Sequence, residues 1–354
     1  MRSPGRRLPL LLLLLPTLPL AAGGARSSAG PETVRARWLM GTVLELRLPE
    51  GTPGADALAE AAFAEVAAVE AAASLWRPGT ELAAVHARCA AGEGVALSET
   101  LGALVDEALR AADLSGGAFS PAVGGLVAAW DLRGEGRTPG AAERARAAAA
   151  ARPAGVRYDR ATRTLRLDPG VTLDLDGIAK GFALDRAATA LRARGVEDAL
   201  LNFGGQLLAI GPPPGKPARE AIVLAPAGPG DPLLSVPLRD ASLSTSSNAE
   251  RVRIVDGKGA GHLLDPRTGE LVPFDGSVSV LAPRGALADA LSTAWAVEGP
   301  AGFRRSDPGA PVRRAGAVAF ALPGAGGRCE TLAERPFQRL VPPARDVAAA
   351  VPVP

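Results

Sequence analysis

The sequence predicts an α+β fold in which mixed, largely antiparallel sheets are flanked by helices. Short runs of strand composition follow one another closely and are separated by tight turns such as Asp256-Gly257, which is typical of antiparallel hairpins. Helical periodicity is confined to a few segments between these runs. The Walker loop and the dinucleotide glycine fingerprint, which mark the common nucleotide-binding folds, do not occur.

The N-terminal half is predicted to begin with a strand over 38–48, because leucines alternate with polar residues at its end. Thr52-Pro53 then opens an Ala-rich helix that runs to about Ala73. The turn over 74–82 displays Trp76, which either packs locally or forms a stacking platform for a planar ligand. The further elements expected before residue 170 are a helix over 98–112 capped by Ser98, a loop over 116–121, a short helix ending at Trp130, an exposed helix within 134–153 and a hairpin over 156–167.

The central stretch 171–186 is predicted to pass from a strand into a helix. Apolar residues alternate with polar ones over 171–176, so Asp174 and Asp176 are expected on one surface. Gly177 follows at the turn, and Lys180 is expected in the first helical turn. A cation at that electropositive end is favourable where an anion binds; the alternative is a solvated lysine on an ordinary turn.

The C-terminal half is predicted to be rich in strands. Paired glycines at 204–205 join two strands within 199–211, after a helix that ends at Gly195. The further strands are expected at 220–225, 233–238, 241–245, 251–255, 261–264, 277–282 and 315–322, with a helix over 286–297 closed by Gly299-Pro300.

Residues 1–25 have the composition of a secretory signal peptide: a basic start, an apolar middle and small residues after it. An exported, periplasmic or cell-envelope location is therefore expected, and the signal could also remain as an anchor. Removing its three arginines from the 39 basic side chains leaves 36 against 37 acidic ones. This balance gives no reason to expect a nucleic-acid partner. Cys89 and Cys329 are compatible with one disulfide in such a compartment, and residues 341–354 are expected to form a disordered tail.

Asp289 and Thr293 are the candidate metal ligands. They are four positions apart on the predicted helix, so their oxygens lie on one face. A carboxylate and a hydroxyl in this arrangement suit a hard cation such as Mg²⁺. The alternative is a surface aspartate and a core-facing threonine that never meet a metal.

His262 is the candidate general base, because it lies beside a turn over 265–269 and histidine titrates near neutral pH. It could instead only cap that turn. His86, in an Ala-rich segment, is interpreted as structural.

Eight short motifs in sequence order resemble the FAD:protein FMN transferase family, also called ApbE, over residues 34–322. They are Met40-Gly-Thr, Ser74-Leu-Trp-Arg-Pro-Gly-Thr-Glu-Leu, Gly117-Ala-Phe-Ser-Pro, Leu173-Asp-Leu-Asp-Gly-Ile-Ala-Lys-Gly-Phe-Ala-Leu-Asp, Leu201-Asn-Phe-Gly-Gly, Thr245-Ser-Ser, His262-Leu-Leu-Asp-Pro-Arg-Thr-Gly and Ala288-Asp-Ala-Leu-Ser-Thr.

The resemblance implies an ApbE-like architecture and a magnesium-dependent transferase of the bacterial envelope. Such an enzyme splits FAD, attaches FMN through a phosphoester to a Thr or Ser of an acceptor protein, and releases AMP. The flavin or adenine contacts that it implies are Met40, Trp76, Ala118, Phe119, Ser120, Asp174, Lys180 and Leu263. The metal ligands that it implies are Asp289 and Thr293 with backbone oxygens of Gly177 and Ser292.

The chain departs from the family pattern at three places. Ser120 replaces an aspartate, Asp176 stands where glycine is common, and Ser247-Asn248 replaces a turn that contains glycine. Two other functions are compatible with the same motifs: an FAD pyrophosphatase, in which water replaces the acceptor hydroxyl, and a flavin-binding protein without catalysis.

Overall fold

The computed structural model describes residues 30–224, 232–248, 253–255, 258–273, 276–305, 318–323 and 330–332. The predicted signal peptide, the C-terminal tail and Cys329 lie outside these residues, so export and the disulfide stay predictions. Cys89 is buried, and its thiol contacts the Leu165 carbonyl at 3.9 Å. Among the described helices, none combines the length and apolar character that crossing a bilayer requires.

The largest layer is an eight-stranded sheet in the order β1-β2-β6-β7-β10-β13-β14-β15, in which each neighbouring pair is antiparallel. This arrangement confirms the predicted fold class. The strands of this sheet are β1 Glu32–Leu39, β2 Thr42–Pro49, β6 Ala199–Phe203, β7 Gln206–Ile210, β10 Ser242–Ser247, β13 Gly276–Ala282, β14 Val318–Pro323 and β15 Glu330–Leu332.

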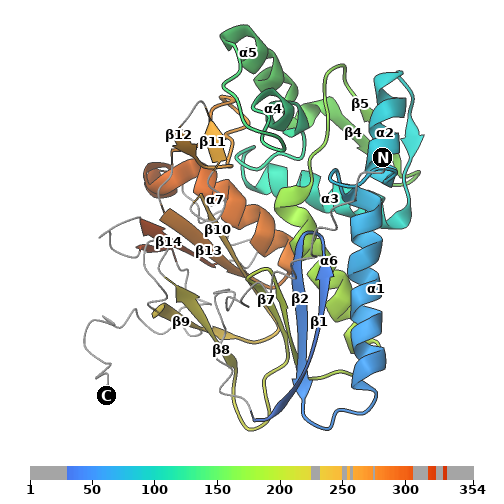
Figure 1. Ribbon diagram of the computed structural model, residues 1–354, viewed down its shortest axis with the longest axis vertical. Coiled ribbons are helices and arrows are strands. Elements are labelled where there is room, and N and C mark those ends of the chain that lie inside the picture. Colours follow the sequence, from blue (N-terminus) through green and yellow to red (C-terminus); the bar gives the residue numbers. More distant parts are fainter. Residues whose placement is uncertain are drawn as a thin grey trace, which may run out of the picture.

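Three long helices pack together beside this sheet (Figure 1). They are α1 Ala55–Ala73, α6 Asp176–Arg192 and α7 Gly285–Arg305. Helix α7 lies against β10 and β13, and α6 lies between α7 and α1. The main hydrophobic core fills the space between these layers, with Leu44, Phe203 and Leu104 among its fully buried side chains.

A second group of elements surrounds one end of α6 (Figure 1). A smaller core unites α4 and α5 with the segment around Leu264. The elements of this group are α2 Glu81–Ala90, β3 Val95–Ala96, α3 Glu99–Leu114, α4 Gly124–Ala129, α5 Ala141–Ala150, the 3-10 turn Pro153–Gly155, β4 Val156–Asp159 and β5 Thr164–Leu167. The remaining hairpins are β8 Arg219–Leu224 with β9 Pro232–Leu238, and β11 Arg253–Val255 with β12 Lys258–Ala260.

The single strand predicted over 38–48 is wrong, because the chain forms a β1–β2 hairpin there. Met40 and Gly41 make its two-residue turn with φ angles of 47° and 74°. Both positions of a type I′ turn require positive φ, which suits the right-handed twist of the strands. Met40 takes this conformation although it is not glycine.

Two other predicted strands are not formed. Residues 171–175 form no strand and make one isolated parallel bridge, from Thr172 to Val123. Residues 261–264 also form no strand and contribute only the Leu264–Leu271 bridge. Gly299 interrupts α7 with a non-helical backbone, at a φ of 61° and a ψ of 178°. This confirms that Gly299-Pro300 closes the helix predicted over 286–297, and a second helical segment follows to Arg305.

Candidate active site

The site is built on the crossing of α6 and α7, where two glycines let the helix backbones touch. A Cβ added to Gly181 would lie 2.0 Å from the Gly285 carbonyl oxygen, far inside van der Waals contact. The Asp185 carboxylate accepts hydrogen bonds from the backbone N–H groups of Gly285 (2.6 Å) and Ala286 (3.0 Å). Because Asp185 on α6 satisfies the first turn of α7, the two helices are held in one register.

Burial raises the pKa of Asp185 from 3.8 to about 6, since the two N–H donors and the Arg284 charge offset only part of the desolvation. The charged form of this carboxyl is therefore disfavoured in the folded protein. Lowering the pH favours the protonated form of Asp185, so the free energy of unfolding should depend on pH as this carboxyl titrates.

Asp289 projects from α7 onto α6 and is only 4% exposed. Its carboxylate accepts a hydrogen bond from the Gly181 N–H at 3.0 Å and lies 3.8 Å from the Lys180 ammonium. Because α6 begins at Asp176, Lys180 lies in the second turn, so the first-turn prediction is wrong. Its ammonium is nonetheless directed toward the predicted metal-ligating carboxylate, and its side chain is 29% exposed.

Gly177 lies directly across from Thr293. A Cβ on Gly177 would be 3.6 Å from the Thr293 hydroxyl oxygen and 3.3 Å from the Phe119 ring. In an α-helix the Gly177 carbonyl is the acceptor for the Gly181 N–H. Because that N–H also donates to Asp289, the carbonyl keeps lone-pair capacity for another partner. The structure thus brings Gly177, Asp289 and Thr293 to one place.

Strand β10 adds hydroxyl groups to this place. The Ser246 hydroxyl lies 2.8 Å from the Ser292 hydroxyl and 3.4 Å from that of Thr293. The Ser292 hydroxyl also donates to the Asp289 backbone carbonyl at 2.9 Å. Ser246 was predicted only as part of the Thr245-Ser-Ser motif, without a role of its own, although period-two alternation within the 242–247 strand could have placed it on the α7 side.

A group of polar side chains forms a second half of the site, which we call the mouth: Trp76, Arg133, Asp174 and Asp176. Asp174 is buried (6% exposed), so the two aspartates differ in environment although both contact Arg133. The Arg133 guanidinium lies 2.6 Å from Asp174 and 3.4 Å from Asp176. The Trp76 indole N–H donates to Asp176 at 3.0 Å. Sequence reasoning missed Arg133, since no local pattern links it to these residues.

Burial and the neighbouring Asp176 raise the pKa of Asp174, and the Arg133 charge opposes this rise only in part. The backbone around Asp174 is fixed from both sides. Its N–H donates to the Pro121 carbonyl at 2.7 Å, and the preceding Leu173 N–H donates to Nε2 of His86 at 3.0 Å. Burial, with a smaller effect from Arg133, lowers the pKa of His86, and this supports the structural role predicted for it.

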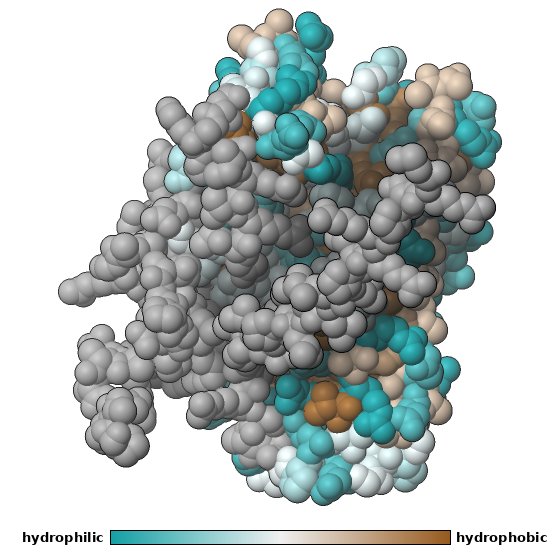
Figure 2. All heavy atoms as spheres, in the orientation of Figure 1, coloured by the Kyte–Doolittle hydropathy of each residue, from teal (hydrophilic) through white to brown (hydrophobic). Residues whose placement is uncertain are grey.

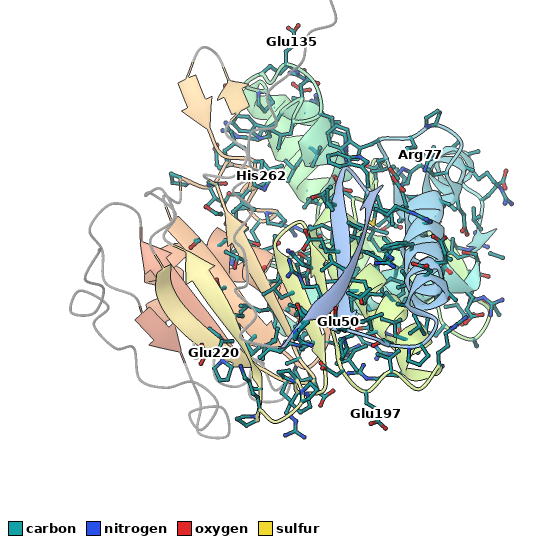
Figure 3. All side chains as sticks on the ribbon, turned by 60° about the horizontal axis from the view of Figure 1, so that its bottom comes forward. Glu50, Arg77, Glu135, Glu197, Glu220 and His262 are labelled. Carbon is teal, nitrogen blue, oxygen red and sulfur yellow. The ribbon has the colours of Figure 1, made fainter. Side chains whose placement is uncertain are left out.

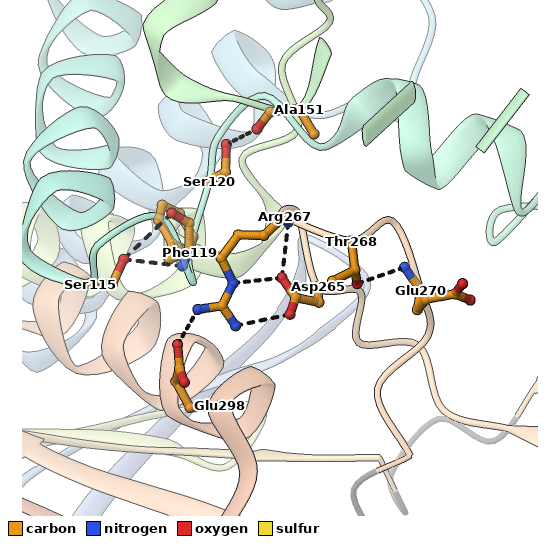
Figure 4. A network of polar contacts seen from close by, with 9 residues as sticks. All are labelled: Ser115, Phe119, Ser120, Ala151, Asp265, Arg267, Thr268, Glu270 and Glu298. Atoms are coloured by element: carbon orange, nitrogen blue, oxygen red, sulfur yellow. Dashed lines mark hydrogen bonds and ion pairs between the residues drawn. The ribbon is translucent and has the colours of Figure 1, made fainter. Parts of the chain in front are cut away.

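The segment 118–120 lines the site through Phe119, while Ala118 and Ser120 are buried behind it. The Ser120 hydroxyl donates to the Ala151 carbonyl at 2.6 Å (Figure 4). It also accepts a hydrogen bond from the Ala122 N–H at 3.1 Å. The serine that replaces the family's aspartate therefore joins its loop to the end of α5. This internal role leaves its hydroxyl few means of contacting a ligand.

His262 lies between the sheet and the α4–α5 helices (Figure 3). The neighbouring Leu263 N–H donates to the Asn248 side chain at 3.3 Å, and Asn248 donates to the Val272 carbonyl at 2.7 Å. Asn248 is two residues from Ser246, so it connects the His262 segment to the metal-ligand candidates. Sequence reasoning noted Asn248 only as a departure from the family.

The turn after His262 is anchored at both ends. Arg267 binds the Asp265 carboxylate through two hydrogen bonds of 2.9 Å and also pairs with Glu298 on α7 (Figure 4). Although burial alone would raise the pKa of Asp265, these Arg267 contacts leave it lowered. The Trp130 indole donates to the Gly269 carbonyl at 2.8 Å. The turn is thus docked on both α4 and α7.

Met40 and Leu263 pack on the main core and add no polar group to the centre.

A hollow of about 1000 Å³ lies away from the helix crossing, between α4, α5 and residues 168–171. The space-filling view shows apolar side chains between the part of the molecule formed by α4 and α5 and the part beside it formed by α2, β4 and β5 (Figure 2). Asp289, Thr293 and Lys180 do not line this hollow, so we place the candidate site at the helix crossing, where the polar groups converge.

The chain is similar to proteins of known activity. A model of the ApbE family matches residues 40–306. The FAD:protein FMN transferase of Rhodobacter capsulatus is 36% identical over 293 residues, which are 78% of this chain and 54% of that protein. The chain therefore spans about half the length of this relative.

A second relative is matched over more of its length. The FAD:protein FMN transferase of Treponema pallidum is 35% identical over 288 residues, which are 76% of this chain and 79% of that protein. The crystal structure of the ApbE protein from Thermotoga maritima superposes with a TM-score of 0.78 at 28% identity, covering 88% of this chain and 99% of that one.

Proposed function

This chain belongs to the ApbE family, and from that premise we propose that it is an exported FAD:protein FMN transferase. In the proposed reaction, an acceptor Thr or Ser hydroxyl oxygen attacks the phosphorus of the FMN half of FAD. The bond from that phosphorus to the bridging oxygen breaks, and AMP leaves. The predicted signal peptide supports an acceptor in the periplasm or cell envelope.

The observation that carries this proposal is the convergence of Gly177, Asp289, Thr293 and Lys180 at one helix crossing. These residues come from two segments that are distant in the sequence. Local patterns indicated an anion role for Lys180 and a metal role for Asp289 and Thr293, and the family resemblance indicated Gly177 as a metal ligand. A buried carboxylate with a lysine beside it, at the edge of a site with hydroxyl groups, is suited to a diphosphate and a cation.

The donor set fits Mg²⁺, which prefers oxygen ligands and keeps several sites for water or substrate phosphate. Asp289 and Thr293 would hold the ion with the backbone oxygens of Gly177 and Ser292. The fit rests on the buried Asp289 oxygens and on the spare capacity of the Gly177 carbonyl. When bound, such an ion acts as a Lewis acid toward the phosphoryl oxygens.

The chain's own residues perform the remaining tasks. Lys180 adds a positive charge beside the diphosphate, which stabilises charge that develops on the phosphoryl oxygens. His262 is our candidate for taking the proton of the acceptor hydroxyl. Its segment is held by Asn248 and by the Asp265–Arg267 turn, which fix the histidine's backbone relative to α7.

One incubation separates the three candidate functions. The purified mature protein is mixed with FAD, Mg²⁺ and a substrate protein that bears a candidate acceptor threonine. We expect covalent flavin on the target, detected by in-gel fluorescence and mass, with one AMP released per flavin attached. Release of free FMN and AMP without labelling would identify a pyrophosphatase, and intact bound FAD would identify a non-catalytic flavin-binding protein.

A further inference from the structure

The mouth of the site joins three segments that are distant in sequence. Trp76 comes from the turn between α1 and α2, Arg133 from the loop after α4, and Asp176 from the first residue of α6. One carboxylate oxygen of Asp176 lies 3.0 Å from the indole nitrogen and 3.4 Å from the guanidinium. Asp176 thereby connects the tryptophan to the arginine.

Arg133 occupies one face of the Trp76 ring. Its guanidinium carbon lies 5.3 Å from the ring centroid, within the range of a cation–π contact. The arginine is itself fixed by its 2.6 Å bond to the buried Asp174. With one face covered and the indole edge bound to Asp176, a planar partner can approach only the opposite face.

Trp76 remains 54% exposed despite these contacts. A large aromatic side chain that is both exposed and held in place is a preformed stacking surface, because its ordering is complete before a ligand arrives. The charges also matter. Arg133 places a positive charge beside both Asp174 and Asp176, which reduces the repulsion of an anionic ligand at this point.

We propose that Arg133 and Asp176 are positioning residues that orient the Trp76 indole with a single open face, on which a planar ring of the flavin dinucleotide stacks. The ring is either the isoalloxazine or the adenine. This inference rests on the proposed function, since it assumes that FAD is the ligand. Asp176 acts here through Trp76 and does not itself touch the ring.

The test is a double-mutant cycle on ligand binding without an acceptor protein. Dissociation constants for FAD, FMN and AMP are measured by calorimetry with Mg²⁺ for wild type, Asp176→Ala, Trp76→Ala and the double variant. We expect Asp176→Ala to weaken FAD binding roughly fivefold when Trp76 is present and not to weaken it in the Trp76→Ala background. A matching loss with FMN assigns the isoalloxazine ring, and a matching loss with AMP assigns the adenine.

Arg77→Ala, on the same turn but paired with Glu70, is the matched control and should bind FAD as wild type does. Arg133→Lys should retain more FAD affinity than Arg133→Ala. If wild type binds FAD but Asp176→Ala changes affinity equally in both backgrounds, or not at all, the positioning role is overturned. If wild type binds neither FAD, FMN nor AMP, the proposed function fails, and this inference fails with it.

Discussion

The two halves of the site are held in different ways. At the α6–α7 crossing, the backbones of Gly181 and Gly285 touch, and Asp289 is 4% exposed. At the mouth, Trp76 is 54% exposed, and its position depends on side-chain contacts with Asp176. Close packing fixes the crossing, whereas polar contacts near solvent fix the mouth. We therefore expect substitutions at the crossing to abolish chemistry or folding and substitutions at the mouth to change affinity.

The largest effect is expected for Asp289→Ala. This variant loses the only carboxylate among the predicted metal ligands, so turnover should fall at least about 10³-fold, or roughly 4 kcal/mol. AMP release is the measurement, with Mg²⁺ varied. Asp289→Asn is the control, because it keeps an oxygen for the Gly181 N–H and should be as inactive with an unchanged melting temperature. Activity within tenfold of wild type would remove α7 from the site.

Gly181→Ala tests the close packing directly. The added Cβ would overlap the Gly285 carbonyl oxygen, so the helices must separate, and the free energy of unfolding should fall by about 3 kcal/mol. Gly125→Ala is the matched control. It is also a helical glycine, but its nearest neighbour would be 3.8 Å away, so it should be neutral or slightly stabilising. Urea unfolding compares the two, and equal curves would show that the crossing tolerates expansion.

The sequence was sufficient for the fold class, because alternation and turn residues are local signals. It failed where distant partners decide the structure. Residues 171–175 alternate like a strand, but their backbone groups bond to His86, Pro121 and Gly124 and not to a neighbouring strand. The prediction of one strand over 38–48 was wrong for a local reason. Met40 adopts a left-handed turn conformation that its side chain does not favour.

The candidate site likewise contains residues that local sequence patterns indicate and residues that they do not indicate. The family resemblance, not a local pattern, indicated Gly177 as a metal ligand. Asp289 and Thr293 could be paired from helical spacing alone, and Lys180 could be given an anion role from its place near a helix start. Arg133, Ser246 and Asn248 could not, since each acts across a long separation in sequence, for example 43 residues from Arg133 to Asp176. Local periodicity can assign Ser246 to one face of its strand, but it does not identify partners across such distances, so these contacts required the folded chain.

Asp185 allows a test of the crossing by pH. An acid whose folded pKa of about 6 exceeds its unfolded value of 3.8 stabilises the protein most when it is protonated. Its contribution is complete below pH 3.8 and is lost as the pH rises through 6, amounting to about 2 to 3 kcal/mol. Asp185→Asn should remove this slope from urea unfolding measured between pH 4 and 7. An unchanged slope would show that another group causes it.

Of the four substitutions compared in these tests, Lys180→Ala, beside Asp289 at the crossing, is expected to have the smallest effect. Lys180 lies 3.8 Å from Asp289 but is 29% exposed, so solvent screens part of its attraction for the diphosphate. The concentration of FAD required should rise about tenfold, and the rise should shrink with added salt. Arg186→Ala, on the same helix but paired with Glu65, is the control that should leave FAD affinity unchanged. Equal affinities for wild type and Lys180→Ala at low salt would mean that the diphosphate binds without this lysine, and the anion would have to be held by the groups of α7 and the mouth alone.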